Sequence, residues 1–132
     1  MENNNFETPS SFEIAQEELK LLLTNGYLAA KETKDHIFNE DNTNKEMLAL
    51  AFLSRARTKF QAAEILYTFN KDLTHIEFED IFHQFDVFDR EVLTNYSNQH
   101  SHQWSDIEYR ALISTLNAVT GLLNLESDFF KA

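Results

Sequence analysis

Histidines and carboxylates are the residues of this chain whose types and spacing could do chemistry. The sequence holds five histidines and 22 acidic residues, but no cysteine. His100 and His102 are separated by one residue, and imidazoles near carboxylates bind divalent metals or form pH-sensitive contacts. His36 is the third candidate metal ligand, because the fold predicted below places the end of its helix beside this pair. A polar connection whose histidines face water explains the same pattern.

A carboxylate-bridged two-metal centre needs a Glu-x-x-His pair on each of two helices. This sequence has no such pair. The nearest approaches involve His36 and His83, and in the predicted fold these histidines lie about 25 Å apart along the bundle axis. Gly-rich phosphate loops and serine-nucleophile motifs are also missing. We therefore expect no resident cofactor and lean away from catalysis, and a metal- or small-ligand-binding bundle, with or without catalysis, remains the alternative.

Length and composition favour long helices in one domain. A chain of 132 residues fits a single core, and only two glycines and one proline interrupt it, while 12 phenylalanines supply core volume. The first residues are polar and acidic, and no apolar run approaches the length of a membrane span. We expect a cytoplasmic protein with no membrane contact. Residues 1–9 are predicted to be a flexible acidic tail, and residues 10–132 a single domain.

The elements that position these residues are marked by a repeated capping signal. Ser or Thr is followed three residues later by Glu at positions 10, 43, 74 and 105, the pattern of a capping box. The near-constant spacing predicts four similar helices joined by short connections, which pack as antiparallel neighbours. The expected fold is an all-α, up-down-up-down four-helix bundle with helices near 10–38, 43–69, 74–99 and 105–130.

Helical spacing also identifies the core. Along the third helix, apolar residues recur at steps of three or four and form a buried stripe: Phe78, Phe82, Phe85 and Phe88. On the first helix, Gly26 falls on the equivalent stripe, which predicts a close helix contact where a side chain would not fit. The alternative is that Asn25 and Gly26 form a turn that splits the helix.

Charge limits the classes of partner. Acidic residues outnumber Lys and Arg by 22 to 11, giving a net charge of −11. Such a surface repels phosphate backbones, so we expect no direct binding of nucleic acid. A basic protein is the partner that this charge favours, while solubility alone also explains the acidity.

Two groups of residues are candidates for contact with that partner. Apolar residues of the first helix cover more than one face, which suggests burial by a partner or by a second copy of the chain: Leu21, Leu23 and Tyr27. The second helix carries a locally basic surface: Arg55, Arg57 and Lys59. The sequence thus predicts a small acidic, non-enzymatic protein-interaction module, such as an inhibitor, an immunity factor or an assembly subunit, with homodimerisation as a further expectation.

Overall fold

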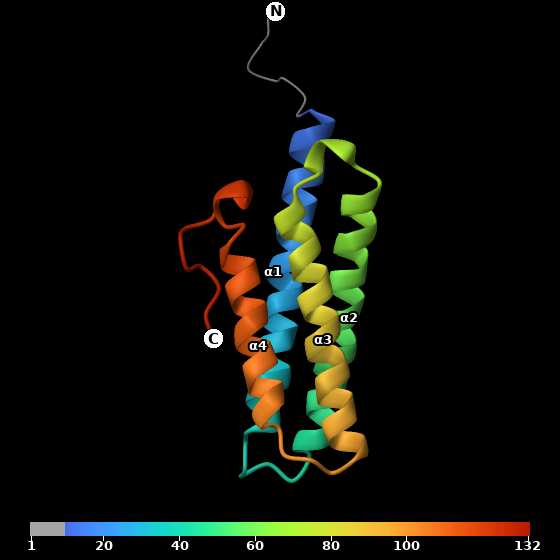
Figure 1. Cartoon of the computed structure of the whole chain (residues 1–132), viewed down its shortest axis with the longest axis vertical. Coiled ribbons are helices and arrows are strands. Elements are labelled where there is room, and N and C mark those ends of the chain that lie inside the picture. The colour runs from blue at the N-terminus through green and yellow to red at the C-terminus, as the bar shows by residue number, and fades with distance from the viewer. Residues whose placement is uncertain (1–9) are drawn as a thin grey trace, which may run out of the picture.

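The chain folds into an all-α four-helix bundle, as predicted. The computed structural model describes residues 10–132, and the tail predicted for residues 1–9 lies outside them. Four helices run alternately up and down the long axis (Figure 1): α1 (Ser11–Ile37), α2 (Lys45–Thr68), α3 (Ile76–Ser97) and α4 (Gln103–Asn117). Two short 3₁₀ turns precede α3 and follow α4, respectively: η2 (Lys71–Leu73) and η3 (Gly121–Leu123).

The helices pack as two close pairs around an aromatic core. α1 contacts α2 extensively and α3 contacts α4, whereas α1 and α4 touch at few positions. All four phenylalanines of the predicted α3 stripe are buried, and Phe85 stacks on Phe60 of α2 with ring centroids 4.3 Å apart. Gly26 lies against this pair, because a Cβ atom there would be only 2.8 Å from Phe60 Cε2. The unbroken helix and its close contact are therefore confirmed.

The helix starts agree with the predicted capping signal only at α1. There the Glu13 amide donates to Ser10 Oγ at 3.1 Å, and the Ser10 amide donates to the Glu13 carboxylate at 3.2 Å. The other three predicted boxes are wrong. The residues that precede those helices make no capping hydrogen bond through their side chains: Asn44, His75 and His102. Ser105 instead lies inside α4, where its buried hydroxyl accepts a hydrogen bond from Asn95 Nδ2 at 3.0 Å.

The predicted extension of the fourth helix to residue 130 is also wrong. α4 ends at Asn117, and the remaining C-terminal segment, residues 118–132, turns back beside α4 (Figure 1). Asn124 and Asp128 adopt left-handed backbone angles, with φ of 57° and 60°, which reverse the chain. Phe130 is a core residue, as its spacing predicted, but it reaches the core through this reversal and not along a helix.

Hydrogen bonds fix the C-terminal segment against α1 and α4. The Asn117 side chain bonds both backbone groups of Phe130, and the Phe130 ring meets Tyr27 edge to face at 5.0 Å. The Lys131 carbonyl accepts hydrogen bonds from the hydroxyls of Tyr27 and Tyr109, each 3.1 Å long. The segment therefore fills one end of the seam between α1 and α4. Among the helices of residues 10–132, none is both long and apolar enough to cross a membrane.

Candidate functional site

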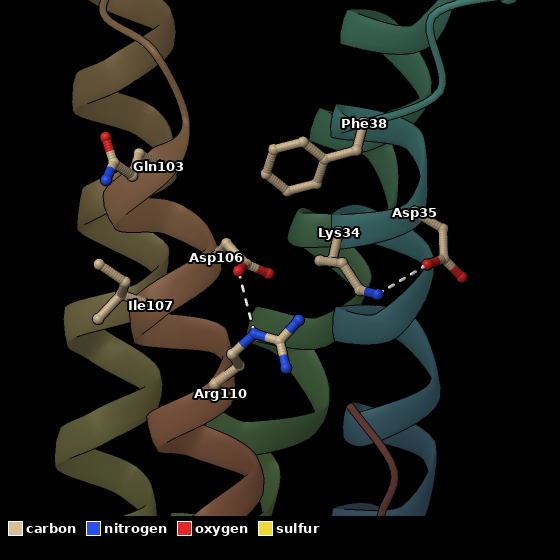
Figure 2. Close-up of a pocket in the computed structure, with 7 residues that line it drawn as sticks. All are labelled: Lys34, Asp35, Phe38, Gln103, Asp106, Ile107 and Arg110. Atoms are coloured by element: carbon tan, nitrogen blue, oxygen red, sulfur yellow. Dashed lines mark hydrogen bonds and ion pairs between the residues drawn. The ribbon is translucent and has the colours of Figure 1, made fainter.

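The other end of the α1–α4 seam is open and forms a groove of about 690 Å³, shown in Figure 2. One wall is the last turn of α1 and the residue that ends it, and the opposite wall is the first two turns of α4. We call this cleft the α1–α4 groove, and these residues line it: Lys34, Asp35, Phe38, Gln103, Asp106, Ile107 and Arg110. The α4 residues recur at steps of three, one and three, which places them on one helix face.

Tyr109 lies beneath this groove and joins it to the C-terminal segment. The Lys34 ammonium is 5.4 Å from the centre of the Tyr109 ring, a cation–π distance. Tyr109 is completely buried, and burial raises its pKa above the ordinary value. Its hydroxyl therefore stays protonated and donates to Lys131 at neutral pH.

Charged side chains within the α1–α4 groove are held by neighbours on their own helices. Arg110 Nε donates to Asp106 Oδ2 at 3.0 Å, and Lys34 Nζ lies 3.2 Å from Asp35 Oδ1 (Figure 2). The terminal amino groups of Arg110 make no hydrogen bond to any part of the chain that the structure describes. The groove thus offers cationic N–H groups beside the apolar side chains of Phe38 and Ile107.

A second groove, of about 530 Å³, lies between the C-terminal end of α2 and the first half of α3. We call it the acidic groove, because four carboxylates line it: Glu64, Glu79, Asp80 and Asp86. None of the four forms an ion pair with a residue in the range 10–132. Glu79 accepts a hydrogen bond from the Tyr67 hydroxyl at 3.1 Å. The other three carboxylates face solvent.

Large apolar side chains stand exposed at the same groove. Ile76 lines it and keeps 72% of its surface accessible. Phe69 and Ile65, which are 81% and 61% exposed, directly follow two lining residues of α2. Leaving such residues in water forgoes roughly 1.5–3 kcal/mol each of possible burial energy.

The structure separates the predicted partner contacts into core and surface residues. Leu23 and Tyr27 are buried, because α1 turns them toward the bundle and the C-terminal segment, and they are therefore removed from the candidates. Arg57 forms a two-pronged ion pair with Asp89 of α3, with hydrogen bonds of 2.7 and 2.8 Å. Its role is thus to neutralise a buried carboxylate. Leu21 remains on the surface.

Arg55 and Lys59 line a third groove, of about 300 Å³, between α1 and α2. The Arg55 guanidinium lies over the ring of Phe52 at 4.9 Å, and neither cation forms an ion pair with residues 10–132. This surface is locally basic, as the sequence indicated, within an acidic protein.

The three candidate metal ligands occupy separate environments. His36 stacks on Phe52 and lies 3.5 Å from Glu32, while His100 is exposed. His102 packs against Tyr96 with ring centroids 4.4 Å apart. Across the described part of the chain, no group of three or more His, Cys, Asp or Glu side chains is arranged to hold a metal ion.

His102 instead belongs to a polar network at the start of α4. Its Nδ1 lies 3.0 Å from Ser105 Oγ, and Asn95 Nδ2 donates to both Ser105 and Glu91. Burial and then the nearby charge of Lys45 lower the pKa of His102 below its ordinary value of 6.5. The imidazole therefore favours its neutral form, which suits a structural hydrogen bond.

Sequence reasoning missed the roles of Asp89 and Arg110. Asp89 directly follows the buried Phe88, and this position was the one available signal that its carboxylate would be buried and paired with Arg57. The predicted topology does bring the end of the first helix and the start of the fourth to one end of the bundle, where Asp35 and Asp106 line the groove. Nothing in the sequence indicated that Arg110 would face α1 there.

Comparisons of the chain with protein-family models, with curated proteins and with solved structures find no match. Function is therefore inferred from the three grooves and from the side chains that line them.

Proposed function

We propose that the protein is a non-enzymatic interaction module that binds a basic segment of a partner protein in the acidic groove. The observation that supports this most directly is the combination of four carboxylates without ion-pair partners in residues 10–132 and exposed apolar side chains beside them. An inhibitor, an immunity factor or an assembly subunit would each use such a surface.

Charge complementarity gives the interaction its specificity. Lys or Arg side chains of the partner would pair with Asp80 and Asp86, which are exposed and six residues apart on α3. The net charge of −11 would attract a basic partner over about a Debye length and accelerate encounter. Acidic partners would be repelled, so the groove also selects against wrong partners.

Apolar contact supplies most of the affinity. Ile76 lines the groove with the carboxylates, and Phe69 directly follows the lining residue Thr68. Both are among the more exposed large apolar residues of the described chain. Aromatic and aliphatic side chains at the centre of an interface, ringed by polar groups, are typical binding hot spots. The expected partner segment therefore carries at least one large apolar residue between its cations.

Two charge-reversed variants test the proposal. D80K/D86K alters the acidic groove, while E18K/E40K changes the net charge equally at exposed positions outside that groove. Each protein is immobilised, and proteins captured from a lysate of the native organism are identified by mass spectrometry. A captured basic protein is then purified and titrated against both variants by calorimetry at low and high salt.

We expect D80K/D86K to weaken binding at least about tenfold, because two opposing charges become repulsive, whereas E18K/E40K retains most of the affinity. Affinity should fall as salt is added. Equal loss in both variants would show that only net charge matters, and equal retention would show that the partner binds elsewhere. Either result would overturn the assignment of the acidic groove.

A further inference from the structure

We infer that the α1–α4 groove is a second binding site, separate from the acidic groove, and that it takes a small organic anion carrying a flat apolar group. Its volume of about 690 Å³ falls within the range of small-molecule sites, roughly 300–1,000 Å³. It combines apolar walls with a few convergent polar groups, which is the usual composition of such sites.

Arg110 and Lys34 supply the recognition of the anionic group. Asp106 holds only the Nε of Arg110, and Figure 2 shows the two terminal nitrogens directed from α4 toward the α1 side of the groove. A guanidinium fixed in this way presents parallel N–H donors that match a carboxylate or a phosphate. Lys34 adds a second cation from the opposite wall.

The two aspartates that line the groove balance the formal charges of Lys34 and Arg110, but each is already engaged with a cation. Asp35 lies 3.2 Å from Lys34 and 3.6 Å from Lys31, so it is shared between two cations. In Figure 2 its carboxylate lies on the side of α1 that faces away from Asp106. Lys31 does not line the groove but partly neutralises Asp35 from outside it. The donors of Arg110 and Lys34 therefore face a ligand within a lining that is neutral overall.

Phe38 and Ile107 supply the recognition of the flat apolar group. The Phe38 ring extends from the end of α1 toward α4, and Ile107 stands on the facing wall (Figure 2). Both side chains are partly exposed, so a planar ligand could stack on the ring and bury both. Gln103, at the first turn of α4, offers an amide that can donate to or accept from ring substituents.

Amide chemical-shift titration of the ¹⁵N-labelled protein tests the inference with defined probes. Phenyl phosphate and phenylacetate are the aromatic anions, and their comparison distinguishes phosphate from carboxylate recognition. Benzyl alcohol carries the ring without charge, and inorganic phosphate carries charge without the ring. We expect saturable shifts at Lys34, Phe38 and Arg110 with at least one aromatic anion, and weaker binding of both controls.

Two arginine variants make the test specific. R110Q removes the guanidinium from the groove, whereas R90Q removes an exposed arginine of α3. We expect R110Q to weaken binding of the aromatic anion about five- to tenfold, since the arginine is solvent-exposed, and R90Q to leave it unchanged.

Four results would overturn the inference: equal binding by R110Q and R90Q, equal binding of benzyl alcohol, shifts confined to residues outside the groove, or no saturable shift below about 10 mM. The unchanged spectrum of each unliganded variant confirms that it is folded. Because Asp80 and Asp86 lie on α3, outside this groove, the result of this titration does not depend on whether a partner binds the acidic groove.

Discussion

Substitution of Gly26 by alanine is expected to destabilise the protein, although alanine is the better helix former. The added Cβ would lie 2.8, 3.0 and 3.2 Å from three ring atoms of Phe60, closer than side-chain carbons approach. Phe60 is itself buried and stacked on Phe85 at 4.3 Å. The ring cannot retreat without disturbing the core between α2 and α3.

The magnitude follows from two opposing terms. Overpacking a well-filled core costs about 1–3 kcal/mol, and an immobile ring places the cost at about 2–3 kcal/mol. Replacing glycine by alanine inside a helix stabilises the folded state by about 1 kcal/mol through helix propensity. The expected net loss is therefore about 1–2 kcal/mol in the free energy of unfolding. With an unfolding entropy of about 2.1 cal/mol/K per residue over 132 residues, the melting temperature should fall by about 4–7 °C.

Urea denaturation and calorimetry measure the loss, and two further variants isolate its cause. G121A is the matched control, because a Cβ at Gly121 would have no neighbour within 4 Å. In an F60L background the ring is gone, so G26A should become neutral or stabilising. A G26A protein as stable as the wild type, or the same loss with and without the Phe60 ring, would refute the proposed contact.

Two other predictions concern the C-terminal segment and the pH dependence of stability. Phe130 is 1% exposed whereas Phe129 is 38% exposed, so F130A should lower the free energy of unfolding by about 3–5 kcal/mol and F129A by much less; urea denaturation showing similar losses would contradict the packing described. The folded-state pKa of His102 lies below 6.5, so the unfolded chain takes up a proton first as pH falls. The contribution of His102 to the free energy of unfolding is complete well above pH 6.5 and is lost as the pH falls through and below 6.5. H102N should flatten this decline. An NMR titration of the His102 ring with a pKa at or above 6.5 would refute this reasoning.

The core and the fold class could be predicted because they depend on local spacing. The α3 phenylalanines recur at helical steps, and any packing that buries one of them buries the others. Gly26 was informative for the same reason, since a glycine on an apolar stripe indicates a neighbour too close for a side chain.

The ends of the helices were less predictable because tertiary contacts decide them. Ser105 and Glu108 have the spacing of a capping box, yet α4 begins two residues before Ser105, whose hydroxyl instead bonds Asn95 on α3. At the other end of α4, the Asn117 side chain can form its hydrogen bonds with the Phe130 backbone only after the chain has turned back. Gly121 and Asn124 were the turn-forming residues that could have indicated this reversal.

The α1–α4 groove could not be derived from the sequence. Its existence depends on how much of the seam residues 118–132 fill, which in turn depends on where α4 ends. The predicted topology brings the end of the first helix and the start of the fourth together, but it does not give the separation of α1 and α4 there. That separation follows from side-chain packing along the whole α1–α4 seam.

The hydrogen bond between Tyr27 and Lys131 joins residues 104 positions apart, so it constrains the order in which the molecule folds. The α1–α2 and α3–α4 hairpins involve nearby residues and can form early, because short loops cost little entropy to close. The C-terminal segment can pack against α1 and α4 only after residues 125–131 have been synthesised and have turned back. During translation, the nascent bundle should therefore expose Tyr27 and Tyr109 to solvent until its last turn has emerged from the ribosome.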